Sequence, residues 1–357
     1  MDPISFLYGI PVVGLVFQFV GYVIEIMPSA GPIFLATATP IALGALCGVM
    51  NERSGVVNIG IEGMMLFGAF AAATTTSILV VQFGGGEGMP FGASPALIIG
   101  VVAAIGMGML VSALHAWLSI SIRADQIISG TIINIIAVGL TGYLNQLISK
   151  TSPPNPGTFS SFIPPEWLVN LPIVGWIINM FLNQGPITMS VLIMVIVLQV
   201  LLFRSRWGLR TRAVGEHPKA AETVGIDVIR LRYRNVILGG IFAGLAGAYL
   251  ALESAGSFQA GMTNGRGFIA LAALIVGRWT PIGAFLAALL FTSSEALERA
   301  IRFGAPPGQL GEILSAIPIQ FYNALPYIIT IVVLAGVVGR SVAPAADGQP
   351  YEKESAT

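Results

Sequence analysis

The chain has 357 residues, of which 55% are hydrophobic and only 10% are charged, against roughly 25% charged residues in an ordinary soluble domain. So few charges cannot coat so apolar a body, and the hydrophobic content excludes a disordered chain. A formal net charge of zero gives no basic footprint for nucleic acid, and a single cysteine with two histidines excludes an internal disulfide and argues against a zinc site. The composition therefore predicts an all-α integral membrane protein.

Apolar runs of spanning length occur along most of the chain, since a membrane-crossing helix needs about 20 mostly apolar residues. They predict a polytopic bundle of about ten transmembrane helices in one transmembrane domain, residues 1–340, followed by a polar and mobile tail, residues 341–357. The first run has no basic n-region, so we expect it to be retained rather than cleaved. The expected helices lie near residues 6–27, 31–50, 60–81, 96–118, 127–147, 186–203, 234–252, 267–277, 282–297 and 325–339.

Basic residues predict the orientation, because cytoplasmic loops are enriched in Lys and Arg. Residues 204–234 carry eight basic side chains against three acidic ones, which indicates a cytoplasmic loop. Counting spans outward from this loop places the N and C termini in the cytoplasm. It also makes residues 148–185 an external connection.

The cytoplasmic loop contains the signal for a short helix in the segment GEHPKAAETVGID, residues 215–227. Pro218 suits the first helical position, and Gly225 suits the left-handed residue that follows a helix end. Ala220 and Ala221 would give this helix a face of small residues. A two-turn helix is not stable alone, so it either docks into a partner protein or belongs to a solvated basic loop near anionic lipid.

Two further segments matter beside this one: NERSGVVNIGIEGMMLFGAFAA at residues 51–72 and GRGFIALAALIVGRWTPIGAFLAALLF at residues 265–291. Together the three resemble the branched-chain amino acid/ribose-type permease family of bacterial ABC transporters, over roughly residues 30–340. The Gly277-Arg278-Trp279 turn before Pro281 is similar to the simple-sugar/nucleoside subgroup. His217 departs from the family pattern, which often has Asn there, and His is a poorer helix N-cap.

The resemblance implies the permease subunit of an ATP-binding-cassette importer in the bacterial inner membrane. Its expected partners are an ATP-binding subunit, a second permease chain (identical or related), an extracytoplasmic solute-binding (lipo)protein and membrane lipid. Nucleosides are the leading solute, with simple sugars or branched-chain amino acids as alternatives. The implied ATPase-coupling residues are Glu216, His217, Pro218, Lys219, Ala220, Ala221, Glu222, Val224 and Gly225.

The chain is not expected to hydrolyse ATP itself. A P-loop needs G-x-x-x-x-G-K-[ST], and none of the three lysines follows a glycine. We therefore expect no catalytic residue, cofactor or metal ligand in this chain, with ATP and Mg²⁺ used by the partner subunit. A membrane-embedded enzyme would need a clustered catalytic constellation, which the sequence does not show.

Polar side chains within the apolar runs are candidates for a substrate pathway, because polar groups in a membrane are costly. A neutral hydroxylated solute would use such donors and acceptors, whereas hydrogen bonds between helices would explain the same residues without a substrate. An ion-driven transporter would instead need a paired acid or histidine at mid-membrane, and only Glu62 and His115 come near. The pathway candidates are Asn58, Glu62, Gln126, Asn134, Thr141, Asn145 and Trp279.

Overall fold

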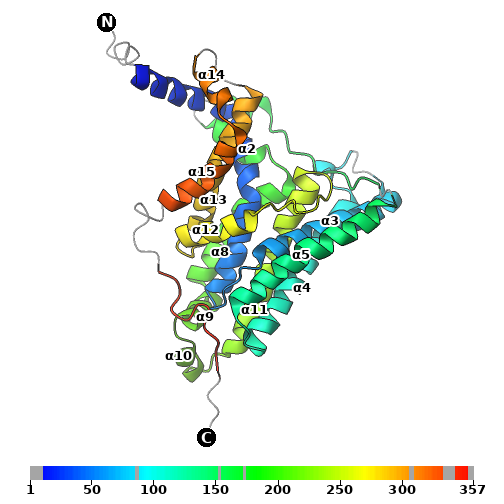
Figure 1. Ribbon diagram of the computed structural model, residues 1–357, viewed down its shortest axis with the longest axis vertical. Coiled ribbons are helices and arrows are strands. Elements are labelled where there is room, and N and C mark those ends of the chain that lie inside the picture. The colour runs from blue at the N-terminus through cyan, green and yellow to red at the C-terminus, as the bar shows by residue number, and fades with distance from the viewer. Residues whose placement is uncertain are drawn as a thin grey trace.

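The computed structural model describes residues 11–84, 88–151, 154–171, 174–304, 309–332 and 342–352. Every regular element within these ranges is helical, which confirms the all-α class (Figure 1). The main helices are α2 (Pro11–Glu52), α3 (Ile61–Phe83), α4 (Pro95–Ala116), α5 (Gln126–Ser149), α8 (Pro186–Arg204), α11 (Val228–Ala248), α12 (Arg266–Val276), α13 (Pro281–Phe303) and α15 (Ile319–Val332). Shorter elements are η1 (Pro90–Gly92), η2 (Trp117–Ser121), α6 (Glu166–Val169), α7 (Gly175–Leu182), α9 (Arg206–Glu216), α10 (Pro218–Thr223), η3 (Tyr249–Ser254) and α14 (Gln309–Ala316).

Six helical segments of the described residues are long and apolar enough to cross a membrane. The predicted count of about ten spans is therefore not confirmed. One reason is that α12 has only 11 residues, well below the spanning length. The six segments are Ala30–Glu52, Ile61–Phe83, Pro95–Ser121, Gln126–Ser149, Pro186–Arg204 and Val228–Ser254.

The first helix differs from its prediction. α2 is one continuous helix of 42 residues, where two antiparallel helices at 6–27 and 31–50 were expected. Pro32 and Pro40 lie within it, and membrane helices tolerate proline because neighbouring groups satisfy the freed backbone. The N-terminal end of α2 lies opposite the end of the molecule that carries α9 and α10 (Figure 1). The predicted cytoplasmic N terminus is thus not confirmed.

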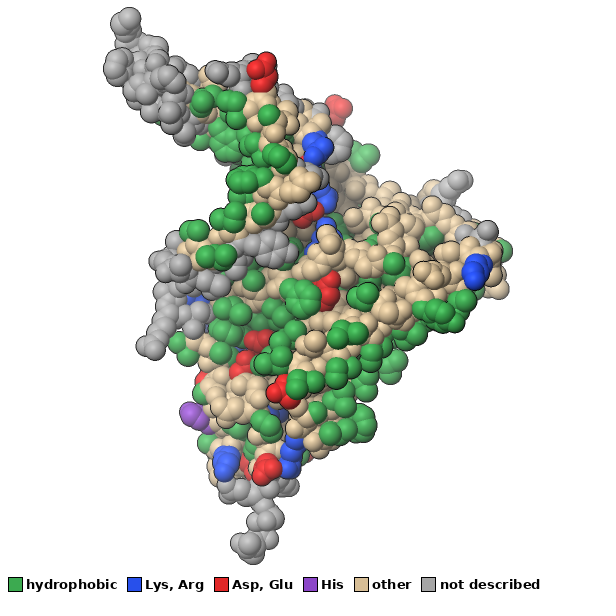
Figure 2. All heavy atoms as spheres, viewed as in Figure 1, with side chains coloured by type: hydrophobic (Ala, Val, Ile, Leu, Met, Phe, Trp, Pro, Cys, Tyr) green, Lys and Arg blue, Asp and Glu red, His purple; other side chains and the backbone are tan. Residues whose placement is uncertain are grey.

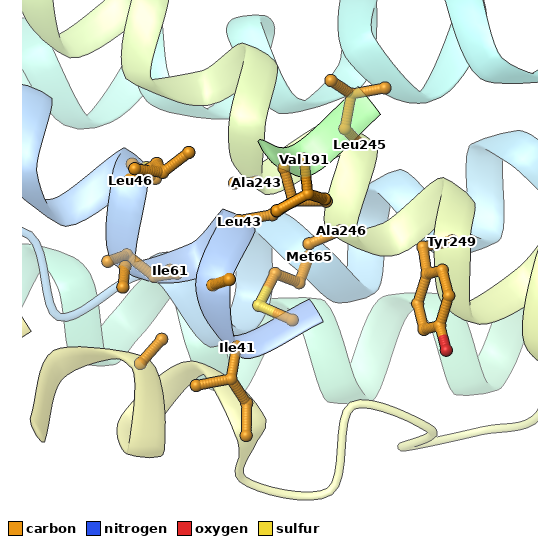
Figure 3. Close-up of a cluster of buried hydrophobic side chains, with 14 of the residues drawn as sticks. Ile41, Leu43, Leu46, Ile61, Met65, Val191, Ala243, Leu245, Ala246 and Tyr249 are labelled. Atoms are coloured by element: carbon orange, nitrogen blue, oxygen red, sulfur yellow. The ribbon is translucent and has the colours of Figure 1, made fainter. Parts of the chain in front are cut away.

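The core is built on close approaches between helix backbones. A Cβ atom added at Gly240 or Gly244 of α11 would overlap the backbone of α4, and one added at Gly68 of α3 would lie 3.0 Å from the Cα atom of Gly244. Small residues permit this contact, which stabilises helix pairs in lipid through van der Waals packing. Figure 3 shows the adjoining cluster, in which α2, α3, α8 and α11 contribute buried aliphatic side chains.

The outer surface of the bundle is apolar. Hydrophobic side chains lie along the edge formed by α5 in Figure 2. On α4, α5 and α8 large aliphatic side chains such as Val102, Ile135 and Ile193 are more than half exposed. Such a surface suits contact with lipid tails or with another membrane chain.

Candidate functional site

The predicted short helix is present as α10, beside α9 at one end of the molecule (Figure 1). Pro218 occupies its first position, and the side chain of His217 makes no capping hydrogen bond. At the other end Gly225 has a φ of +83°. Its N–H donates to the Glu222 carbonyl at 2.8 Å, and the Ile226 N–H donates to the Ala221 carbonyl at 3.1 Å. These two bonds form a Schellman motif, so both ends of α10 are set as the sequence predicted.

The two alanines of α10 face different surroundings. Ala221 is buried and packs with Val214 of α9 and Val228 of α11. Ala220 is exposed, as is Lys219, and Val224 is 74% exposed. The face of α10 available to another protein therefore includes Ala220 but not Ala221.

A segment near the C terminus packs against this site. Residues 344–352, here called the C-terminal clasp, include Ala346 and Tyr351, both of which are buried. The N–H of Ala346 donates to the Gly215 carbonyl at 2.9 Å, and the Tyr351 hydroxyl bonds to Glu222. The expectation of a mobile tail was wrong for these residues.

Arg232 of α11 links the clasp to the rest of the fold. Its side chain is 2% exposed, Nε donates to the Ser54 carbonyl at 3.1 Å, and Nη1 donates to the Gln349 carbonyl at 2.9 Å. The guanidinium also lies 6.0 Å from the centre of the Tyr351 ring. In the sequence, Arg232 is one of the eight basic residues of the expected cytoplasmic loop 204–234, with no signal for this role.

The described residues form three clefts beside α10, of which the smallest, about 500 Å³, lies between Glu222, residues 225–230 and Tyr351. A second, of about 910 Å³, lies between the segment Glu216 to Ala220 and the clasp. The third, of about 1060 Å³, is basic and includes Arg210, Arg230 and Arg234 among its lining residues. None of the seven predicted pathway residues lines any of these three clefts.

The break between α12 and α13 is fixed to the end of α2. Arg278 and Trp279 adopt φ values of 53° and 52°, which are costly for residues with a side chain. Arg53 offsets the cost of these φ values with two hydrogen bonds. Its Nε donates to the Trp279 carbonyl at 2.7 Å, and its Nη2 donates to the Arg278 carbonyl at 3.1 Å. Trp279 is 5% exposed, and its part in a substrate pathway stays a prediction.

Glu62 caps the short helix α12. Its Oε1 accepts from the Gly265 N–H at 2.8 Å and its Oε2 from the Gly267 N–H at 2.6 Å. A carboxylate at a helix N-terminus satisfies orphan donors and interacts favourably with the helix dipole. Glu253 does the same for α8, accepting from the Ile187 and Thr188 N–H groups at 2.8 and 3.1 Å. Both carboxylates therefore cap the N-terminus of a helix.

Side chains of α4 and α5 supply hydrogen-bond partners for the backbone groups of the non-helical stretch between α2 and α3. Gln126 accepts from the Val57 N–H at 2.7 Å. Asn134 donates to the Ile59 carbonyl at 2.9 Å and accepts from the Gly63 N–H at 2.8 Å. Irregular backbone at membrane depth needs such partners, so hydrogen bonding between elements accounts for Gln126 and Asn134.

Of the remaining pathway candidates, two make hydrogen bonds to nearby backbone groups and one lies near the end of α5. Asn58 accepts from the N–H of Gly60 at 3.0 Å, and the Thr141 hydroxyl donates to the carbonyl of Ala137, one turn earlier, at 2.6 Å. Asn145 is half-buried in the last two turns of α5. The part of these seven residues in a substrate pathway stays a prediction.

Comparison with known proteins gives the family. Residues 33–334 match the model described as "Branched-chain amino acid transport system / permease component". The chain is 40% identical to the guanosine ABC transporter permease protein NupQ of Bacillus subtilis, over 93% of this chain and 98% of that protein. It is 38% identical to the nucleoside ABC transporter permease protein NupC of Lactococcus lactis, over 89% of this chain and 95% of that protein.

A third relative, a putative glucose ABC transporter permease protein TsgC13 of Haloferax volcanii, is 35% identical over 89% of this chain and 95% of that protein. No solved structure matches the chain. With six helices of spanning length among the described residues and a family match over most of its length, the chain belongs to the permease family of branched-chain amino acid transport systems and is a membrane-embedded ABC transporter permease.

Proposed function

We propose that the chain is the permease subunit of an ATP-driven importer of nucleosides. The observation that carries this is the 40% identity over almost the whole of a permease named for guanosine, joined by 38% identity to one named for nucleosides. A permease named for glucose follows at 35%, which makes a sugar the second candidate.

The proposed importer contains four further kinds of component. An ATP-binding subunit, which uses ATP and Mg²⁺, docks on the exposed face of α10, and a second permease chain, identical or related, completes the pathway. A solute-binding (lipo)protein delivers solute from outside, and lipid surrounds the apolar face. The basic segment 204–234 and the clasp that packs on it both lie in the cytoplasm, whereas the continuity of α2 gives no support to a ten-span count or a cytoplasmic N terminus.

Uptake and binding measurements test the solute. The complete transporter is reconstituted in proteoliposomes with its solute-binding protein, and guanosine, adenosine, ribose, glucose and leucine are offered separately. We expect saturable, ATP-dependent uptake of the nucleosides alone. Uptake of glucose, ribose or leucine without nucleoside uptake would overturn the choice of solute.

Docking is tested on α10. Ala220→Arg places a long charged side chain on the exposed face, and we expect weaker binding of the ATP-binding subunit with unchanged thermal stability of the permease. Ala260→Arg is the matched control, because Ala260 is exposed in the loop before α12, away from α10. Equal binding by both variants would show that α10 is not the docking element.

A further inference from the structure

We propose that the C-terminal clasp, residues 344–352, is a second part of the docking surface for the ATP-binding subunit. It forms one wall of the cleft whose other wall is the segment Glu216 to Ala220, and it holds α10 in position. The proposal rests on the proposed function, because the partner is the ATP-binding subunit of that importer. Neither the family nor the relatives' names assign any role to this segment.

Backbone contacts fix where the clasp lies. The Ala346 N–H bonds to the Gly215 carbonyl at 2.9 Å, and the Ala345 N–H bonds to Glu216 Oε2 at 3.1 Å. A turn follows at once, in which the Asp347 N–H donates to the Pro344 carbonyl at 3.0 Å. A Cβ atom at Gly215 would overlap the backbone of Arg53. The clasp is therefore hydrogen-bonded to the last two residues of α9, and Gly215 in turn packs closely against the backbone of Arg53, just beyond α2.

Tyr351 completes the inner side of α10. Its ring is 7% exposed and packs with Val214, Ala221 and Val228, which come from three different helices. Its hydroxyl bonds to Glu222 of α10. A helix of six residues has too few internal hydrogen bonds to persist alone. The position of α10 therefore depends on packing, and one of the side chains that supplies this packing belongs to the clasp.

The lining of the shared cleft suits a protein partner. On one wall His217, Lys219 and Ala220 are exposed, and on the other wall Gln349, Pro350 and Glu352 are exposed. The volume of about 910 Å³ admits several side chains of a partner. A protein that enters the cleft to reach the coupling residues also meets the clasp. The partner chemistry is that of a cytoplasmic protein surface rather than a lipid, since the lining mixes acidic, basic and small apolar residues.

The experiment compares variants in the complete transporter. The ATP-binding subunit that co-purifies with the full-length chain is identified by photolabelling with an ATP analogue and is then titrated onto each permease variant in proteoliposomes. We expect Tyr351→Ala to weaken its binding by about tenfold and Tyr351→Phe, which keeps the ring, by less than about threefold. We also expect fewer solute molecules transported per ATP hydrolysed for Tyr351→Ala. Val342→Ala is the control, because Val342 is 75% exposed and lies outside the clasp and the cleft.

The outcomes separate this proposal from the proposed function. Removal of residues 342–357 should act at least as strongly as Tyr351→Ala, with the Tyr351 variants deciding if the shortened chain does not fold. Tyr351→Ala could leave both the affinity and the transport per ATP unchanged while Ala220→Arg weakens binding. That result would overturn the proposed role of the clasp and leave docking on α10 intact. Unchanged binding in both variants would overturn docking on α10 as well.

Discussion

The indole N–H of Trp279 donates a 2.5 Å hydrogen bond to Oε2 of Glu52, across 227 positions of sequence. Both side chains are buried, so the contact joins the last residue of α2 to the break between α12 and α13. Together with the two bonds from Arg53 to the same turn, it holds this junction by three hydrogen bonds.

Trp279→Phe is expected to destabilise the permease by about 1–3 kcal/mol, because a buried carboxyl group loses its donor. The measurement is thermal unfolding in detergent micelles. Trp167→Phe is the matched control, since Trp167 is 71% exposed and its replacement should leave the midpoint unchanged. Equal midpoints for the two variants would show that the Glu52 contact contributes nothing.

Glu62→Ala is expected to lower stability by about 1–3 kcal/mol, because the N–H groups of Gly265 and Gly267 lose their acceptor. Glu62→Gln, which keeps one acceptor oxygen, should lose less. Measuring transport beside stability separates this capping role from the predicted pathway role. A raised KM for solute with unaltered stability in Glu62→Gln would favour the pathway instead.

Gly225→Ala is expected to loosen the end of α10 at a cost of about 1 kcal/mol, because the left-handed conformation is unfavourable for alanine. Hydrogen exchange of the backbone amides at positions 225 and 226 reports the opening of this helix end directly. In the control, Gly139→Ala, the added methyl group meets no atom within 4 Å in the middle of α5. It should not change exchange at α10.

The clasp is expected to be held less firmly as pH rises. Burial raises the pKa of Asp347 from 3.8 to about 7, against hydrogen bonds with Glu52 and the Gly348 backbone and the charge of Arg232, all of which lower it. Because the folded clasp favours the protonated acid, its stabilising contribution is complete below pH 3.8 and is lost as pH rises through about 7. Protection of residues 344–352 from proteinase K, normalised to a peptide of the same sequence, should fall between pH 6 and pH 8.

Asp347→Asn should abolish most of that pH dependence, since the amide stays neutral. Glu352→Gln is the control, because Glu352 belongs to the same clasp and its side chain is 74% exposed. A wild-type chain with the same protection at pH 6 and pH 8 would contradict this interpretation of Asp347.

Features encoded by neighbouring residues were predictable from the sequence. The expected helices 60–81 and 127–147 agree closely with α3 and α5, because the limits of an apolar run of spanning length mark the ends of the helix. α10 was predicted for a similar reason, since Pro218 and Gly225 determine the start and the end of a helix within one turn of their own positions.

Features that depend on distant partners were not predictable. Glu25 and Pro28 interrupt the apolar pattern near the start of the chain, which resembled a turn between two spans rather than one long helix. The clasp was missed because Tyr351 meets Glu222 across 129 positions. Asn134 was ambiguous for a physical reason, since a polar side chain in an apolar run gives one signal for a substrate contact and for a hydrogen bond between helices.

The short helix α12 is tethered at both extremities to neighbours on the same stretch of chain, Glu62 at its beginning and Glu52 with Arg53 just beyond its end. Such a doubly anchored segment cannot tilt or slide independently of α2 and α3 without breaking several buried bonds. During transport we expect these three elements to travel as a single rigid block, so that alternation between inward and outward forms occurs at the borders of that block and not within it.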